Sequence, residues 1–304
     1  MTHSPERSAR RPLDAAALWH VLRRLQSQAS APWLHGEVAR RMAERLPIIK
    51  LQPDVVLDWS AFLGASRGRL AQTYPKARIV AVEADEPRRA ATAAALAPPW
   101  WSPRRWAAAA PGVLVESDVA AGAGQLLWSN MGLHLVADPQ AVMAQWHRAL
   151  AVDGFVMFST LGPGSLQTLA SLYAAQGWPA PFAPFVDMHD LGDMLIEAGF
   201  ADPVMDQEQI TLTWASSAAL LAELRTLGGN LSPRRLPGLR TPRWQRRLLD
   251  ALGALSAADG RLSLNFEIVY GHAFRPAPRP RLAAETAVPL DDLRAMVRAG
   301  RRAG

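Results

Sequence analysis

The feature of the sequence that most limits its fold is an alternation of short apolar strands and helices between residues 55 and 160. The predicted strands cover 55–58, 79–83, 113–116, 125–130 and 155–160. Helical segments are predicted over 66–73, 86–96 and 138–150. This alternation is typical of a parallel sheet with helices on both faces. The sequence therefore predicts an α/β fold.

Two more strands and several helices are predicted around this unit. The segments 204–214 and 262–274 alternate apolar and polar residues, as ITLTW does at 210–214. Helical periodicity over 13–46 is interrupted at Ala31-Pro32, one helix ends near Gln176, and another over 187–198 ends at Gly199. We expect a disordered segment over 1–12, one domain over 13–274 with cap insertions at about 161–188 and 215–261, and a Pro-, Arg- and Ala-rich tail over 275–304 with a short helix near 290–299.

Composition excludes several classes of protein. The chain has no cysteine, which rules out disulfides, thiolate zinc sites, iron–sulfur clusters and cysteine nucleophiles. It has no apolar run near the roughly 20 residues of a membrane span, and its start lacks the apolar core of a secretory signal. We expect a cytoplasmic protein. The net charge of +6 permits an acidic partner without identifying one.

Polar side chains stand at the ends of four predicted strands. Asp58 ends the first strand, Glu83 ends the second, Asp118 follows the third, and Ser129-Asn130 end the fourth. In a doubly wound sheet, ligands bind beyond the carboxyl ends of the strands. An acid after strand two can accept hydrogen bonds from ribose hydroxyls, and one after strand three can receive the amino group of adenine. The pattern favours an adenosine-containing cofactor.

The loop after the first strand narrows the choice of cofactor. It reads VVLDWSAFLGAS at 55–66 and contains neither the G-x-G-x-x-G fingerprint of dinucleotide sites nor the G-x-x-x-x-G-K phosphate loop. Such a loop lacks the closely spaced glycines that a pyrophosphate needs. S-adenosylmethionine carries no phosphate and tolerates a looser turn, so a methyltransferase is favoured over a dehydrogenase.

Several longer stretches carry a resemblance to a known family. They read LLWSNMGLHLVADP, FVMFSTLGPGSL, PFVDMHDLGDMLIEAGFADPVMD and FEIVYGHAF. From about Pro32 to Phe274 the chain resembles the malonyl-acyl carrier protein O-methyltransferases of biotin synthesis, which are class I S-adenosylmethionine-dependent enzymes. The resemblance implies a Rossmann-like, seven-stranded, mostly parallel sheet with an antiparallel last strand, helical cap insertions, and S-adenosylmethionine as cofactor.

The resemblance also implies a cofactor site, with departures in the loop. In the family this loop reads L-D-L-G-C-G-T-G, of which this chain keeps only the last glycine, Gly64; Ser60 and Phe62 replace the others, and Gln125 stands where an acid usually opens strand four. We expect Phe62 to strain the turn, since a left-handed non-glycine residue costs about 1–2 kcal/mol, and to fill the methionine pocket. The implied cofactor residues are Asp58, Ser60, Gly64, Glu83, Asp118, Ser129 and Asn130.

The chemistry of the family needs an anchor for the acceptor rather than a general base. A malonyl carboxylate with a pKa near 4 is already ionised at neutral pH, so catalysis depends on alignment and desolvation. The candidates to hold this carboxylate are His134, Arg225 and, more weakly, His189. Against these roles, His134 in an apolar stretch fits a packed core histidine, and Arg225 fits a solvated helix face.

One basic run points to a partner. It contains Arg234, Arg235, Arg240, Arg243, Arg246 and Arg247. An acidic acyl carrier protein would be steered to it; with Trp244 it could also contact RNA, and it could equally be a solvated surface.

Two other clusters are interpreted structurally. We read Asp187, His189, Asp190 and Asp193 as a helix start rather than as metal ligands, and expect no metal site. We expect Trp100, Trp101 and Trp106 to cover the sheet.

Other functions stay open at this point. The altered loop motivates a non-catalytic homologue that acts as a binding or regulatory protein, and a methyltransferase for another small acceptor is also compatible. A nucleic-acid methyltransferase is disfavoured because WSNM stands where an N/D-P-P-Y motif would be. A nicotinamide oxidoreductase lacks its glycine signature.

Overall fold

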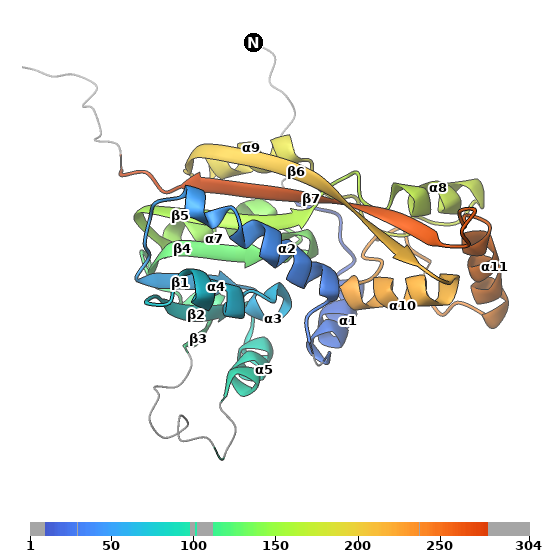
Figure 1. Ribbon diagram of the computed structural model, residues 1–304, viewed down its shortest axis with the longest axis horizontal. Coiled ribbons are helices and arrows are strands. Elements are labelled where there is room, and N and C mark those ends of the chain that lie inside the picture. Colours follow the sequence, from blue (N-terminus) through green and yellow to red (C-terminus); the bar gives the residue numbers. More distant parts are fainter. Residues whose placement is uncertain (1–9, 29, 98–100, 102–111, 237, 279–304) are drawn as a thin grey trace, which may run out of the picture.

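The computed structural model describes residues 10–28, 30–97, 101, 112–236 and 238–278, which form a seven-stranded sheet surrounded by helices (Figure 1). The strands are β1 (Val55–Trp59), β2 (Arg78–Glu83), β3 (Val113–Val115), β4 (Gly124–Asn130), β5 (Leu150–Leu161), β6 (Ala201–Trp214) and β7 (Leu262–Phe274). They lie in the order β3-β2-β1-β4-β5-β7-β6. The first five pair in parallel, and β7 runs antiparallel to both its neighbours. The predicted fold class is confirmed.

Helices cover both faces of the sheet. The helices are α1 (Ala15–Gln26), α2 (Trp33–Ala43), α3 (Ala61–Gly64), α4 (Arg67–Thr73), α5 (Glu86–Leu96), α7 (Pro139–Ala149), α8 (Gln167–Ala175), α9 (Met188–Glu197), α10 (Ser217–Leu227) and α11 (Pro242–Gly253), with short 3-10 turns η1 (Leu46–Ile48), η2 (Glu116–Asp118) and η3 (Leu133–Leu135). Successive residues of a strand point to opposite faces. Val56 therefore packs with α2 and α4, whereas Leu57 packs with α7 and α9.

One strand begins earlier than predicted, because it contains polar residues that are typical of a turn. β5 begins at Leu150 rather than at 155, although it contains Asp153-Gly154. Asp153 has a positive φ of 63°, and the register between β4 and β5 shifts between Gly124 and Leu126. A bulge of this kind lets a strand pass through turn-like residues.

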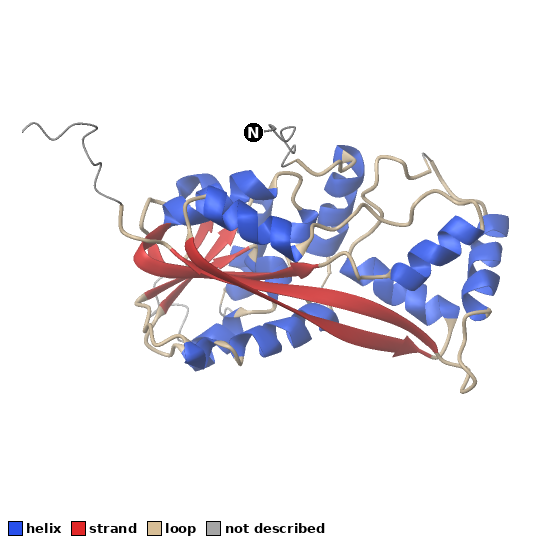
Figure 2. Ribbon diagram, turned by 90° about the horizontal axis from the view of Figure 1, so that it is seen from above, coloured by secondary structure: helices blue, strands red, loops and turns tan. Residues whose placement is uncertain are grey.

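The last two strands carry the cap. β6 and β7 form a long antiparallel pair that extends beyond the other strands, and α8, α10 and α11 gather at its far end (Figures 1 and 2). Figure 2 shows these helices as a group separated from the helices that cover the sheet. The cap helices come from the chain between β5 and α9 and between β6 and β7, the two segments in which insertions were expected.

The start of the described chain is held in place. The prediction of disorder over 1–12 is wrong at Arg11, which is buried; residues 1–9 lie outside the described residues. The guanidinium of Arg11 donates to the carbonyl oxygens of His134 and Pro184, the latter at 2.8 Å. The partners of Arg11 lie more than 100 positions away in the sequence, so no local pattern could have revealed them.

Local signals explain the helix starts. The side chain of Asp187 caps α9 by accepting a hydrogen bond from the backbone N–H of His189, so it acts as a helix cap, as predicted. The expectation that tryptophans of the proline-rich loop cover the sheet is wrong for Trp101, whose exposure is 70%. Trp100, Trp106 and the tail from 279 lie outside the described residues.

Candidate functional site

Two acids lie side by side at the carboxyl edge of the sheet. Asp58 pairs in register with Ala81 of β2, two residues before Glu83, so both side chains point to the same face. Both acids are fully buried. One carboxylate oxygen of Glu83, Oε1, accepts hydrogen bonds from the backbone N–H of Phe62 at 2.9 Å and from Thr92 Oγ1 at 2.7 Å. Glu83 thus joins the loop after β1 to helix α5.

Burial makes these two carboxyl groups unusually basic. It raises the pKa of Asp58 to about 8, with the negative charge of Glu83 as a second cause and the nearby charge of Arg67 acting in the opposite direction. Burial also raises the pKa of Glu83 to about 7, against the effect of its hydrogen bonds. Asp58 Oδ1 and Glu83 Oε2 have no hydrogen-bond partner among the described residues. Buried oxygens without partners suit a ligand that brings hydroxyl or ammonium donors.

The loop after β1 is strained at positions other than the one expected. Phe62 lies in α3 with a helical backbone, so the expectation of a left-handed Phe62 is wrong. Ser60 and Ala65 instead flank α3 with φ of 56° and 50°. The left-handed backbone of Ser60, which was expected to replace a glycine, costs about 1–2 kcal/mol.

Side chains from other elements form hydrogen bonds with the carbonyl oxygens of the loop that follows β1. His35 Nδ1 lies 2.8 Å from the carbonyl oxygen of Leu63, and Asn130 Nδ2 donates to that of Gly64 at 2.6 Å. Asn130 also donates to the carbonyl oxygen of His35 and accepts from Ser159 Oγ at 2.7 Å. Asn130, expected to contact the cofactor, therefore fastens the loop. Sequence reasoning missed His35, since it comes from the distant helix α2.

The remaining predicted cofactor residues are spread along the same edge. A Cβ on Gly132 would lie 3.3 Å from Ser60 Cβ and 3.6 Å from Ser129 Oγ, so the loops after β1 and β4 meet there. Asp118 lies exposed in η2, and its carboxylate accepts from Ser117 Oγ. A Cβ on Gly64 would lie 2.8 Å from Ser66 Oγ, so this glycine makes room for a side chain of the loop itself.

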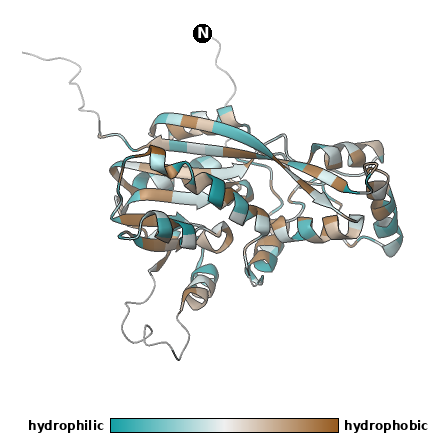
Figure 3. Cartoon of the chain, viewed as in Figure 1, coloured by the Kyte–Doolittle hydropathy of each residue, from teal (hydrophilic) through white to brown (hydrophobic). Residues whose placement is uncertain are grey.

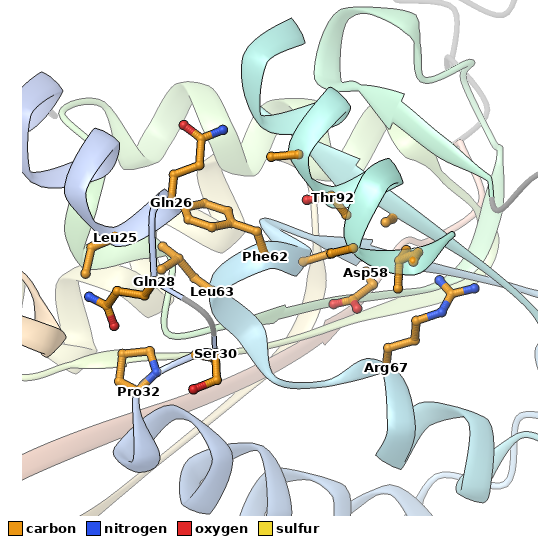
Figure 4. A pocket seen from close by; sticks show the side chains of 16 residues that line it. Leu25, Gln26, Gln28, Ser30, Pro32, Asp58, Phe62, Leu63, Arg67 and Thr92 are labelled. Atoms are coloured by element: carbon orange, nitrogen blue, oxygen red, sulfur yellow. The ribbon is translucent and has the colours of Figure 1, made fainter. Parts of the chain in front are cut away.

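A small cavity adjoins Asp58, one of the two buried acids. It measures about 220 Å³ and is lined by Asp58, Phe62, Arg67 and Thr92, together with the end of α1 (Figure 4). Ligand sites commonly measure about 300–1,000 Å³. The cavity lies below that range, and Phe62 forms part of its wall.

A larger cavity lies between the sheet edge and the cap. It measures about 670 Å³ and extends from η3 and the end of β5 to α8, α10 and α11. Most of its wall is aliphatic or aromatic. Its charged lining consists of Arg11, Arg24, Arg225 and Arg240, and no Asp or Glu is among its lining residues. An apolar cavity with arginines and no acid suits an anion with an apolar arm.

Arg24 lies against the end of α10, the helix that carries Arg225, and no Asp or Glu is among the residues that line the cavity around them. Burial lowers the pKa of Arg24, and the positive charge of Arg225 lowers it further. Arg24 donates to the carbonyl oxygen of Gly228 and, at 3.4 Å, to that of Arg225, at the end of α10. An anion bound between two such guanidinium groups relieves their repulsion. Arg225 was a sequence candidate; Arg24 was missed because it lies in the N-terminal helix.

The two histidine candidates differ in position. His134 is buried and lines the cap cavity, and burial lowers its pKa well below the usual value, with the charges of His35 and Arg11 as further causes. It is therefore neutral at neutral pH. His189 is exposed, pairs with Asp187 at 2.8 Å, and is not among the cavity-lining residues. The structure therefore does not bring His189, at the start of α9, together with the other two carboxylate candidates.

The basic run divides into anchored and exposed arginines. Arg235 forms an ion pair with Asp14 at 3.0 Å, and the guanidinium of Arg240 lies 4.0 Å from the ring centre of Trp244. Arg243, Arg246 and Arg247 are exposed on α11, and Arg234 is exposed before this helix. Figure 3 shows α11 as a largely hydrophilic helix at the end of the cap.

Comparisons with known proteins identify the family to which the chain belongs. No protein-family model matches the chain. A malonyl-acyl carrier protein O-methyltransferase of Laribacter hongkongensis is 40% identical over 255 residues, which is 82% of this chain and 84% of the relative. The chain belongs to this family. A second malonyl-acyl carrier protein O-methyltransferase, from Gallionella capsiferriformans, is 36% identical over 81% of this chain and 85% of its own.

Solved structures share the fold of this O-methyltransferase family member. YcgJ from Bacillus subtilis aligns with a TM-score of 0.52 at 9% identity, over 80% of this chain and 99% of its own. A proposed methyltransferase from Bacillus halodurans aligns with a TM-score of 0.52 at 15% identity, over 78% and 100%. No helix within the described ranges is long and apolar enough to cross a membrane. Nor do three potential metal-binding side chains gather anywhere in the described part of the chain.

Proposed function

We propose that the chain transfers a methyl group from S-adenosylmethionine to the free carboxylate of a malonyl thioester on acyl carrier protein, an early step of biotin synthesis. The relatives described above are named as malonyl-acyl carrier protein O-methyltransferases. The observation that carries the proposal is the cap cavity, which has four arginines and no acid among its lining residues. Its apolar walls suit the thioester arm, and its charge suits the carboxylate.

The buried acids would hold the cofactor. Glu83 Oε2 is free to accept from ribose hydroxyls, because Oε1 already accepts from Phe62 and Thr92. A positively charged group of the ligand beside Asp58 Oδ1 would lower the raised pKa of Asp58 and so favour its ionised form. Both unpartnered oxygens fit the donors of S-adenosylmethionine, which when bound supplies an electrophilic methyl group. Asp118, Ser60 and Ser129 lie along the same edge and complete the proposed set.

The cap cavity would orient the acceptor. Arg24 and Arg225 hold the carboxylate between them, with Arg11 and neutral His134 in the same wall. The carboxylate is ionised at neutral pH, so no side chain has to remove a proton. The apolar wall excludes water from the carboxylate and leaves it a stronger nucleophile. Catalysis in this account comes from alignment and desolvation.

The exposed arginines near the cavity would receive the carrier protein. Trp244 and Gln245 of α11 line the cavity, as does Arg240 just before this helix, whereas Arg243 and Arg246 of α11 are exposed. An acidic carrier protein at α11 would thus stand where its thioester arm can enter the cavity. Attraction between opposite charges mainly speeds such an encounter.

Transfer of radioactivity from methyl-labelled S-adenosylmethionine to malonyl-acyl carrier protein tests the proposal. We expect label in the carrier fraction with the wild type. For Arg225→Gln we expect KM for malonyl-pantetheine to rise by about tenfold, as for loss of a charge-assisted hydrogen bond. Arg261→Gln is the matched control, because Arg261 bonds to Thr213 and is absent from the cavity lining. Absence of label with the wild type would refute the proposed activity.

A non-catalytic homologue is the second candidate. The observation that favours it is the small volume beside Asp58, about 220 Å³, with Phe62 in its wall. Calorimetric titration with S-adenosylhomocysteine separates the two candidates. Heat of binding supports the enzyme, and no heat supports the binding protein.

A further inference from the structure

Helix α1 contributes to the walls of both cavities. Leu25 and Gln26 line the small cavity beside the acids, whereas Arg24 of the same helix and Arg11 just before it line the cap cavity. Figure 1 shows α1 between the carboxyl edge of the sheet and α10. A movement of this one helix therefore changes both sites together.

Apolar packing holds α1 over the loop that follows β1. Ala17, Val21 and Leu25 of α1 form a cluster with Leu63 of α3, and the partly buried Phe62 packs against this cluster. The backbone N–H of Phe62 is in turn bonded to Glu83. In this closed arrangement both acids are buried, and the cavity beside Asp58 is below the size of an ordinary ligand site.

Polar contacts fasten α1 to the cap at several points. Asp14 pairs with Arg235, and its backbone N–H donates to the carbonyl oxygen of Leu231 at 2.9 Å. Gln28 Nε2 donates to the carbonyl oxygen of Thr226 at 3.2 Å. Each contact is of modest strength, so the segment can open without unfolding the sheet. Opening would break these bonds together and withdraw Arg24 from the cap cavity.

We propose that α1 is a lid shared by the two cavities, so that the cofactor binds before the malonyl thioester. The cofactor enters while α1 is open, and closure of α1 returns Arg24 to Arg225 and completes the anion site. A thioester bound first would hold α1 shut through its carboxylate and block the cofactor. This order rests on the proposed function, since it assumes both ligands.

A disulfide can lock the lid. A Cβ on Gly229 would lie 2.9 Å from Cγ2 of Val21, and that Cγ2 marks one position that the sulfur of a cysteine at 21 can take, so the two side chains would be within reach of a disulfide. The chain has no cysteine of its own, so Val21→Cys with Gly229→Cys can form only this bond within the chain. The reduced double variant is the matched control, since it has the same sequence as the oxidised one.

The test measures association of S-adenosylhomocysteine by stopped-flow tryptophan fluorescence. Because the binding-competent open state is depleted, we expect the oxidised variant to associate at least about tenfold more slowly than the reduced one. Excess malonyl-pantetheine added first should also slow association to the wild type. In the single variant Val21→Cys, maleimide labelling of this buried position should be slowed by bound S-adenosylhomocysteine.

The outcomes separate the lid from the proposed function. Equal association rates for oxidised and reduced protein, with binding intact, would overturn the lid and leave the enzyme standing. No binding to either the wild type or the reduced variant would overturn the proposed cofactor and the lid with it. Slow association only in the oxidised protein supports both.

Discussion

The substitution Asp58→Asn tests the electrostatics of the buried acids. Burial raises the pKa of Asp58 from its usual 3.8 to about 8, so the folded protein keeps this proton while the unfolded chain has lost it. A raised pKa of an acid in the folded state contributes stability that is complete below the unfolded pKa and is lost as the pH rises through the folded pKa. The wild type should therefore lose stability from about pH 4 to about pH 8.

The size of this effect follows from proton linkage. A group that is protonated only in the folded state contributes a slope of about 1.4 kcal/mol per pH unit. Between about pH 5 and about pH 7, Asp58 and Glu83 both contribute, since the pKa of Glu83 is raised to about 7. The slope for the wild type should approach about 2.8 kcal/mol per pH unit. Asparagine matches the neutral carboxyl in shape, so Asp58→Asn should reduce the slope to about half.

Urea unfolding followed by circular dichroism, over about pH 5 to about pH 8, measures these slopes. Asp118→Asn is the matched control, because Asp118 lies exposed at the same edge of the sheet. The control should keep the slope of the wild type. Identical slopes for the wild type and Asp58→Asn would refute the reasoning, because Asp58 would then be ionised in the folded protein.

Three further predictions concern the loop, the sheet edge and the cap. Phe62→Gly should tighten the binding of S-adenosylhomocysteine in calorimetry, because it removes a ring from the cavity wall. It should also lower the free energy of unfolding by about 2–3 kcal/mol, because apolar burial is lost and a glycine is placed in α3. No gain in affinity would show that Phe62 does not limit the site. Trp59→Phe should lower the free energy of unfolding by about 1–3 kcal/mol in urea unfolding. Trp59 Nε1 donates to Glu116 at 2.9 Å, so the substitution removes the hydrogen-bond partner of this Glu116 oxygen; an unchanged midpoint would count against this. Arg243→Glu with Arg246→Glu should raise KM for malonyl-acyl carrier protein several-fold at low salt and leave KM for malonyl-pantetheine unchanged; equal effects on both substrates would disprove a carrier surface.

Much of the architecture could be predicted because strands and helices leave periodic signals in the sequence. The apolar runs around Val56 and Leu126 placed β1 and β4, and the alternation at 262–274 placed β7 with its observed bounds. The start of β5 was missed because Asp153 and Gly154 resemble a turn. The ordered Arg11 was missed because its partners are backbone carbonyl oxygens far along the chain.

The candidate site could be predicted only in part. Asp58 and Glu83 were placed together because strand ends share an edge of the sheet, and the structure brings them to one face. The sequence could not show that the side chain of Asn130 donates to the carbonyl oxygens of Gly64 and His35, because these hydrogen bonds depend on contacts across three elements. Nor could it pair Arg24 with Arg225, which lie 201 positions apart.

Calorimetric titration of the wild type and of Glu83→Gln with S-adenosylhomocysteine tests the central claim most directly, that the buried acids at the sheet edge receive an adenosyl ligand. The account predicts saturable binding to the wild type and at least about a tenfold loss of affinity in Glu83→Gln, because the amide oxygen takes the place of Oε1 and an NH2 donor then stands at Oε2, where the ribose hydroxyls need an acceptor. Equal affinity for both proteins would contradict the account, and so would an absence of binding to the wild type.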